Sequence, residues 1–240
     1  MIFCISAYQL LNYYGADRAA ENDFAQLLPP DLSGSVVEVE DGKSAYDLLL
    51  PYYKGLRAEN EDMVGWLRIP GTRISYPVMQ TPHSPEYYLD RNFDRQYSAA
   101  GTLFASDLSD VDLPSDVVII YGHRMRTGAM FGSLGDFLKE DFFLEHQKII
   151  FDTFTERNEY RIYCIFTLGV GPDVVNEFEY FNYNFFTDRN DFNSFMSRVR
   201  FLSEIENPAN EPAFGDKILL LSTCEYTHEN GRLVVVAVRD

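Results

Sequence analysis

Two apolar stretches near the C-terminus decide the fold and bring together two reactive side chains. The first is Lys217-Ile-Leu-Leu-Leu-Ser-Thr-Cys224-Glu-Tyr226, and the second is Arg232-Leu-Val-Val-Val-Ala-Val238. Runs this rich in branched aliphatic residues predict buried β-strands. If the two strands pair antiparallel, the short connection between them, with Asn230-Gly231 as a turn signal, leaves Cys224 close to Arg232.

Six more short β-like runs precede this pair, and turn residues separate them. They cover residues 65–69, 74–79, 102–105, 117–121, 148–151 and 160–168, to which 217–223 and 233–238 add the last two. Eight short runs at this spacing predict a closed barrel or a sandwich rather than alternating strands and helices. Two helices are expected to interrupt them, over 130–139 and over 188 to about 203; in the second, apolar residues recur at helical spacing.

The N-terminal 43 residues differ from the rest. Residues 1–14 are largely apolar but are fewer than the roughly 20 that a membrane-spanning helix needs. They form either an amphipathic helix packed on the domain or the outer end of a membrane anchor, and Tyr13-Tyr14 suit the interfacial position of an anchor. Residues 16–28 predict a helix that Pro29-Pro30 ends, and 31–43 predict a linker. Ser44 is expected to cap a second helix, which Pro51 bends or shortens.

Composition argues against several classes of protein. The chain has 20 Lys+Arg against 37 Asp+Glu, a net charge of -17, and no basic cluster, so we expect no nucleic-acid partner. Three cysteines are too few and too scattered for a disulfide framework or a zinc site. The acidic residues at 107, 110, 112 and 116 lack the glycine and the terminal glutamate of a calcium-binding loop. The sequence therefore shows no pattern typical of a zinc or calcium site.

The predicted neighbours Cys224 and Arg232 have a possible chemical use. A nearby cation lowers the pKa of a thiol and makes it a better nucleophile. Arginine does not deprotonate in proteins, so its use would be to donate to the oxyanion that forms when a thiolate attacks a carbonyl. The alternative is that Cys224 is a small buried apolar residue and Arg232 a solvated strand end.

A nucleophilic cysteine usually needs an imidazole, and the chain has four histidines. His123 is placed best, because it follows an apolar strand that ends in Gly122, which allows the backbone to turn. His83 is expected in a surface loop and His146 at a charged helix end. His228 follows Cys224 in a loop and stays an alternative to His123.

Three motifs, in order along the chain from about residue 44 to the C-terminus, resemble those of the class B sortases. The segment Ser222-Thr223-Cys224 followed by Arg232-Leu-Val-Val235 is similar to the cysteine and arginine motifs of that family. Tyr121-Gly-His123, continuing to Phe131 and Leu134, is similar to the histidine motif. Residues 60–70, 74–80 and 87–93 resemble its first barrel segments. One departure is Leu221-Ser222-Thr223 where many sortases have Thr-Leu-x-Thr, although the threonine before the cysteine is kept.

The resemblance implies a mostly β fold with added helices. It would be the eight-stranded sortase β-barrel with N-terminal helices and a helix in the connection between strands six and seven, roughly residues 169–215. That connection would form one wall of a groove for a peptide. Residues 1–43 would be an N-terminal segment that could be a truncated membrane anchor. Residues 44–240 would be the catalytic domain. The protein would lie at the extracellular face of the cell membrane of a Gram-positive-type bacterium.

The resemblance also implies a cysteine transpeptidase that anchors surface proteins to the cell wall. Cys224 would attack the carbonyl after the threonine of a C-terminal sorting signal, His123 would protonate the leaving amine, and Arg232 would hold the oxyanion. An amine of peptidoglycan or of a pilin would then resolve the thioester, without any cofactor. The residues expected to contact the peptide are Ser222, Thr223, Glu225, Tyr180 and Tyr183. The alternatives are a cysteine peptidase that uses water as acceptor and a non-catalytic surface-binding barrel.

Overall fold

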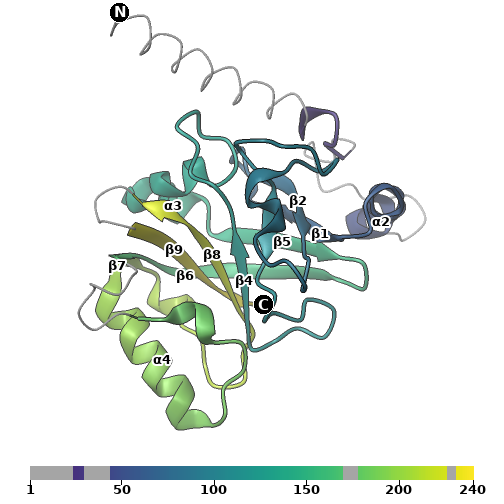
Figure 1. Ribbon diagram of the computed structural model, residues 1–240. Helices are drawn as coiled ribbons and strands as arrows, with labels where there is room; N and C mark the ends of the chain where they lie inside the picture. Colours follow the sequence, from purple (N-terminus) through teal and green to yellow (C-terminus); the bar gives the residue numbers. More distant parts are fainter. Residues whose placement is uncertain (1–23, 30–43, 170–177, 226–230) are drawn as a thin grey trace, which may run out of the picture.

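The computed structural model describes residues 24–29, 44–169, 178–225 and 231–240, and for residues 224 and 225 it describes the backbone. Within this part of the chain the strands form one mixed sheet in the order β5-β1-β2-β3-β4-β8-β9-β6-β7, and pairing of β5 with β6 closes eight of them into a barrel (Figure 1). The strands are β1 (Met63–Arg68), β2 (Ser75–Met79), β3 (Leu103–Ala105), β4 (Val117–Tyr121), β5 (Lys148–Thr153), β6 (Arg157–Gly169), β7 (Ser203–Glu206), β8 (Ile218–Glu225) and β9 (Gly231–Arg239). The prediction of an eight-stranded barrel is confirmed.

Helices cover the outside of the barrel, with α2 and α4 on opposite sides of it (Figure 1). Ser44 caps α2 as expected, in a reciprocal capping box with Asp47, and Asp188 caps α4 by accepting from two backbone N–H groups. The α-helices are α2 (Ala45–Glu59), α3 (Glu140–Glu145) and α4 (Arg189–Leu202), and the 3-10 helices are η1 (Tyr87–Asp90), η2 (Gly132–Leu138), η3 (Tyr180–Asn182) and η4 (Pro208–Asn210).

Three details differ from the sequence-based expectations. The helix predicted over 130–139 is a 3-10 helix, η2, followed directly by α3. Of the two effects expected of Pro51, bending or shortening of the helix, shortening does not occur, because α2 runs on to Glu59 and packs Leu49, Tyr53 and Leu56 against the barrel. The short strand β7 follows α4 and pairs with β6 outside the closed ring; its alternation of half-buried and exposed residues over only four positions gave no clear strand pattern.

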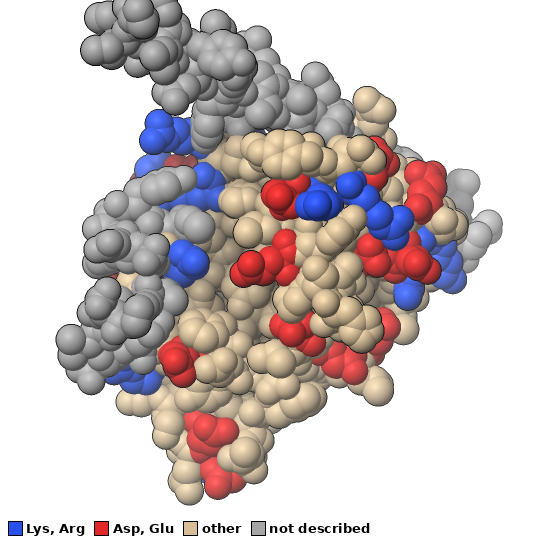
Figure 2. All heavy atoms as spheres, in the orientation of Figure 1, with Lys and Arg blue, Asp and Glu red and all other residues tan. Residues whose placement is uncertain are grey.

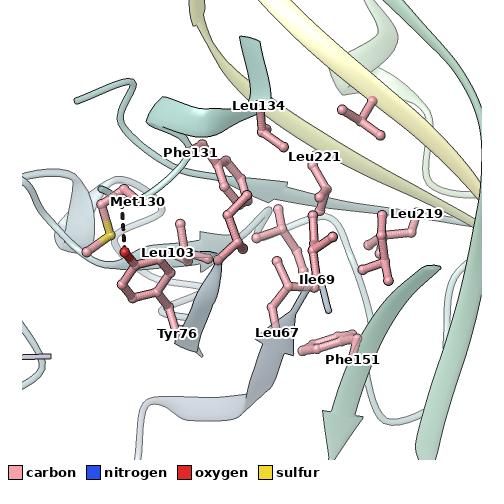
Figure 3. Close-up of a cluster of buried hydrophobic side chains, with 14 of the residues drawn as sticks. Leu67, Ile69, Tyr76, Leu103, Met130, Phe131, Leu134, Phe151, Leu219 and Leu221 are labelled. Carbon is pink, nitrogen blue, oxygen red and sulfur yellow. Dashed lines mark hydrogen bonds between the residues drawn. The ribbon is translucent and has the colours of Figure 1, made fainter. Parts of the chain in front are cut away.

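The strands β4, β8 and β9 are apolar throughout because both of their faces are buried. Alternate residues point into the barrel, where Leu219 and Leu221 meet Leu103, Phe131 and other side chains drawn in Figure 3. The residues between them, Ile218 and Leu220, pack outward against α4 and the aromatic residues before it. A strand buried on both faces loses the polar alternation of a half-exposed strand.

Parallel pairing of β4 with β8 positions the chemistry. The two strands run side by side in register from Val117 opposite Ile218 to Tyr121 opposite Ser222. Neighbouring parallel strands end at the same edge of a sheet, so the residues that follow β4 and those that end β8 lie at one rim of the barrel. His123, which follows β4, and Cys224, near the end of β8, therefore belong to the same rim.

A buried polar cluster fixes α2 to the barrel. The Asp152 carboxylate is fully buried and accepts from Arg157 Nε at 2.7 Å and Nη2 at 2.9 Å, as well as from the Tyr53 hydroxyl at 3.3 Å. Burial raises the pKa of Tyr53, and the nearby carboxylate raises it further, so the hydroxyl stays a neutral donor. A buried carboxylate is tolerated where several donors satisfy it, as here.

The described part of the N-terminal segment, residues 24–29, packs on the barrel. Phe24 and Ala25 are helical, and the chain then turns, in agreement with a helix ending near Pro29. Most of that predicted helix, the apolar residues 1–14 and the linker lie outside the described residues. In the described part of the chain, no helix has the length and apolar character that crossing a membrane requires.

Phe24→Ala is expected to lower the free energy of unfolding by about 3 kcal/mol. The Phe24 ring is 3% exposed and packs edge-on against Tyr76, with 5.4 Å between ring centroids, as part of the barrel's main hydrophobic cluster. Urea unfolding followed by circular dichroism measures the loss. The control is Leu28→Ala, since Leu28 is 50% exposed and should change little. Equal stability of both variants would mean that this segment does not belong to the folded unit.

Candidate active site

A cleft of about 530 Å³ lies at the rim where β4 and β8 end. Its walls come from five parts of the chain: the segment around η1, β3 and the loop after it, the end of β4, the segment around η3, and the paired strands β8 and β9. The lining residues are Pro85, Glu86, Leu89, Phe104, Ser106, Asp107, Leu108, Tyr121, Gly122, His123, Tyr180, Phe181, Asn182, Ser222, Thr223 and Arg232. Two of the three predicted catalytic residues, His123 and Arg232, therefore share one cleft.

The backbone of Cys224 lies directly opposite Arg232 in the antiparallel pairing of β8 with β9. The predicted pairing of the two C-terminal strands is thus correct to the residue. Thr223, which precedes Cys224, also lines the cleft, while the side chain of Cys224 is outside the described part. Arg232 is half-buried and donates from Nη1 to its neighbour's carbonyl, Gly231 O, at 3.1 Å. The register therefore brings a cysteine and a guanidinium to adjacent positions on the cleft wall.

The loop that carries His123 is held by several backbone contacts. Gly122 donates to Ser222 O at 3.2 Å, and a Cβ at this position would lie 2.4 Å from a Leu103 methyl and 2.8 Å from the Phe131 ring, so any larger residue would force these two side chains to shift. Phe131 N donates to His123 O at 3.0 Å, which closes the loop. Met130 has a positive φ of 51° and donates its N–H to the Tyr76 hydroxyl at 3.2 Å, the dashed line in Figure 3. Such a backbone persists only where its surroundings fix it.

The His123 ring is anchored to the opposite wall of the cleft. Its Nε2 lies 2.7 Å from the carbonyl oxygen of Leu89, in η1. A carbonyl oxygen can only accept, so Nε2 is the donor in this contact. The anchoring group is a neutral backbone carbonyl that belongs to a segment 34 residues earlier in the chain.

The residues predicted to contact a peptide divide into three groups. Ser222 and Tyr180 line the cleft, and their hydroxyl oxygens are 2.8 Å apart in a hydrogen bond. Thr223 also lines it; its side chain is 2% exposed, and Oγ1 has no hydrogen-bond partner among the described residues. Tyr183 lies elsewhere, in a second hollow beside α4, packed against Phe195. The side chain of Glu225 is outside the described part.

Charge is distributed unevenly along the cleft. Glu86 and Asp107 line it on the walls contributed by the η1 and β3 segments, and Arg232 lines it from β9. Burial raises the pKa of Tyr121, with smaller contributions from Tyr180 and Asp107, so this hydroxyl stays protonated at neutral pH. Acidic side chains are scattered over the whole face shown in Figure 2, in keeping with the net charge of -17.

Sequence reasoning missed one whole wall of the cleft. This wall contains apolar side chains that are unusually exposed for their size, Leu89 at 38% and Leu108 at 47%, beside the acidic residues Glu86 and Asp107. The segment 87–93 resembled a family motif, but nothing in its composition linked it to His123. The link is a backbone carbonyl, which every residue has and which no sequence pattern can mark.

His83 and His146 lie where they were expected. His83 is exposed in a loop, and His146 follows α3 with its ring stacked on Phe142 at 4.1 Å between centroids. His228 is outside the described residues. In the acidic loop, Asp116 is paired with Lys217 at 2.9 Å and accepts from Phe186 N. These contacts are those of a structural loop.

Cys164 is expected to be inert toward alkylation in the folded protein. It lies in β6 with its side chain fully buried, and burial raises its pKa to about 12. Because a raised thiol pKa leaves only about 10⁻⁴ of the group as thiolate at pH 8, iodoacetamide should not modify it. Peptide mapping by mass spectrometry after native alkylation measures this, and Cys164→Ala should keep its activity. Rapid native labelling of Cys164 would contradict the buried position.

The geometry suits acyl transfer at a carbonyl. An imidazole and a guanidinium line one cleft together with hydroxyl groups, and the backbone of Cys224 lies opposite the residue that carries the guanidinium. Thiolate attack, proton transfer and oxyanion stabilisation need these three side-chain types.

Comparison with known proteins gives consistent results. A family model described as the sortase domain matches residues 67–240. Sortase B of Listeria monocytogenes is 31% identical over 185 residues, covering 76% of this chain and 71% of the relative. Sortase B of Staphylococcus aureus is 31% identical over 189 residues, covering 78% and 74%. The solved Staphylococcus aureus sortase B–substrate complex superimposes with a TM-score of 0.71 at 26% identity, covering 81% of this chain and 91% of that one.

Proposed function

This chain belongs to the sortase family, in its class B, and is therefore a cysteine transpeptidase; on that basis we propose that Cys224, His123 and Arg232 are its catalytic residues. The observation that carries the proposal is the register of β8 and β9, which sets Cys224 opposite Arg232 on the wall of the cleft that also holds His123. These positions match the three motifs whose resemblance to the family was recognised in the sequence.

The reaction divides into two acyl transfers. In the first, the Cys224 thiolate attacks a peptide carbonyl, the carbon–nitrogen bond breaks, and His123 as imidazolium gives its proton to the departing amine. In the second, neutral His123 takes a proton from an incoming amine, which attacks the thioester and releases the thiolate. Arg232 donates to the oxyanion in both steps, where a pre-positioned donor is most effective.

The peptide substrate is a C-terminal sorting signal held in the cleft. The solved complex of the Staphylococcus aureus relative with its substrate supports peptide binding in this fold. In this chain, Thr223 lines the cleft but its hydroxyl is buried, so it would shape the wall rather than bind the peptide directly. Ser222 and Tyr180 are already paired with each other and would shape the wall. Tyr183 lies outside the cleft, so its contact with the peptide would have to be indirect.

Family membership associates the protein with the Gram-positive cell envelope. The finer proposal is that it acts at the extracellular face of the membrane, joined to it through residues 1–43, and transfers surface proteins to an amine of the cell wall or of a pilin. Residues 44–240 would form the catalytic domain. The packing of α2 through Tyr53 and Asp152 supports including α2 in this domain, and Phe24 from the preceding segment also packs on the barrel.

Product analysis tests the proposed reaction. The protein is incubated with a fluorescent library of sorting-signal peptides, with and without added amines, and products are identified by mass spectrometry. A transpeptidase gives an amine-linked product that grows at the expense of hydrolysis as the amine concentration rises. If the amount of hydrolysis product does not fall when amines are added, the protein is a peptidase. Absence of any acyl-enzyme on Cys224 would favour a non-catalytic barrel.

Arg232→Lys is expected to lower kcat by about 10²- to 10³-fold with a smaller change in KM. Lysine keeps the charge but lacks the planar fork with which arginine can bind an oxyanion and hold a second contact such as Gly231 O. Steady-state kinetics with the best library peptide measure both constants. The control is Arg239→Lys, on the same strand but paired with Glu156 away from the cleft. Wild-type kcat in Arg232→Lys would reduce the role of Arg232 to its charge.

A further inference from the structure

The carbonyl groups at the end of η1 each have a partner, and one of these partners is the His123 ring. Tyr88 O accepts from Thr102 N at 3.0 Å, Asp90 O from Ser98 N at 2.9 Å, and Arg91 O from Thr102 Oγ1 at 2.8 Å. Leu89 O, in the middle of this row, accepts from His123 Nε2 at 2.7 Å. Backbone carbonyls in a folded interior are paired almost without exception. The His123 imidazole therefore supplies the hydrogen-bond donor for the Leu89 carbonyl, and the same hydrogen bond holds the imidazole in place.

Gly101 packs directly beneath that row. It has a positive φ of 59°, and it is buried. A Cβ at this position would lie 2.4 Å from Leu89 O and 2.6 Å from Tyr88 O, closer than any real Cβ contact. Both clashing atoms belong to the backbone, so they could not rotate away as a side chain does. Only a glycine lets the Leu89 carbonyl stay where it meets His123.

We propose that Gly101 is a positioning residue that holds the Leu89 carbonyl against His123. The resulting hydrogen bond fixes the neutral ring as its Nε2–H tautomer. Nδ1 is then the nitrogen that exchanges protons during catalysis. The proposal rests on the proposed role of His123. In the imidazolium both nitrogens carry a proton; Nδ1 gives its own to the departing amine and later takes one from the incoming amine. The Nε2–H group stays hydrogen-bonded to Leu89 O in both steps, so the ring needs no rotation between them.

The tautomer can be measured without turnover. Full-length protein labelled with ¹⁵N-histidine is studied by long-range ¹H–¹⁵N correlation at a pH where the ring is neutral, and the His123 signals are assigned by their loss in His123→Ala. The nitrogen with the lone pair resonates far downfield of the nitrogen with the proton. We expect the downfield signal on Nδ1. A downfield signal on Nε2 would overturn the proposal and would leave transpeptidation, tested by product analysis, untouched.

Gly101→Ala tests the positioning role. We expect a mixed tautomer signal for His123 and a fall in kcat of roughly 10- to 100-fold, since a misplacement of about 1 Å can cost that much. The matched control is Gly215→Ala, because Gly215 also has a positive φ, of 106°, but nothing lies within 4 Å of an added Cβ. Gly215→Ala places a Cβ at a φ even less favourable for an L-residue but without a clash, and it should keep the wild-type tautomer and kcat.

A milder variant covers the case in which Gly101→Ala does not fold. Thr102→Val is nearly isosteric and removes the hydrogen bond from Thr102 Oγ1 to Arg91 O at the edge of the carbonyl row. It should shift the His123 signals in the same direction by a smaller amount. Wild-type His123 signals and wild-type kcat in Thr102→Val, and in Gly101→Ala if it folds, would show that this row does not position the ring.

Discussion

Cys224→Ala is expected to abolish both peptide cleavage and formation of a thioester, with the fold unchanged. The substitution removes the only atom that the proposed mechanism allows to attack the peptide carbonyl. Cys164 cannot take over as the thiol nucleophile, because it is buried in β6 with a pKa raised to about 12. The measurement is intact-protein mass spectrometry after incubation with a sorting-signal peptide, beside a fluorescence assay of cleavage.

Two controls make this result interpretable. Circular dichroism and the melting temperature should match those of the wild type, since alanine differs little in size from cysteine at a strand end. Cys164→Ala should still form the acyl-enzyme. Cleavage by Cys224→Ala at the wild-type rate would show that Cys224 is not the nucleophile. Loss of acylation in a folded Cys164→Ala would mean that the two cysteines had been assigned the wrong roles.

His123→Ala is expected to lower kcat/KM by at least 10²- to 10⁴-fold or so, the usual contribution of a general acid–base group. The ring both donates to the leaving amine and accepts from the incoming one, so both half-reactions should slow. Wild-type activity plotted against pH should be bell-shaped, because the mechanism needs one partner protonated and the other ionised. Steady-state kinetics over a pH series, with unfolding monitored in parallel, measure both effects.

Two other histidines serve as controls for this prediction. His83→Ala should behave as the wild type, since His83 is exposed in a loop and outside the cleft. His228→Ala should also stay active. Full activity of His123→Ala combined with loss in His228→Ala would show that the histidine in the loop after Cys224 is the acid–base group.

The eight strands of the barrel were predictable because burial on one or both faces leaves a local pattern. The runs at 117–121, 217–223 and 233–238 are continuous and apolar, since the barrel interior covers one face and α4 the other. The cap of α2 was predictable for the same local reason, because Ser44 bonds to a backbone group three residues away. The opposition of Cys224 and Arg232 followed from a short antiparallel connection, which fixes register within a few residues.

Features that depend on long-range contacts were not predictable in this way. The helix α2 continues through Pro51 because its apolar face packs on the barrel and that gain outweighs the local cost of the proline, whereas sequence reasoning left open whether Pro51 would bend or shorten the helix. β7 exists only because β6 offers it an edge. Tyr183, one ring in an aromatic run, packs beside α4 instead of lining the cleft, and nothing in the run distinguishes it from Tyr180.

By itself, then, the sequence determined the barrel, the family and the residue types of the reaction, because strand burial, capping and catalytic motifs are written in neighbouring residues. Only the tertiary structure decided how His123 is held. Its ring binds a backbone carbonyl at Leu89, and Gly101 leaves room for that carbonyl. A sequence pattern could mark neither partner. The Leu89 carbonyl is a group that every residue has, and Gly101 acts through the absence of a Cβ. The geometry of such a contact exists only when η1, β3 and β4 have come together.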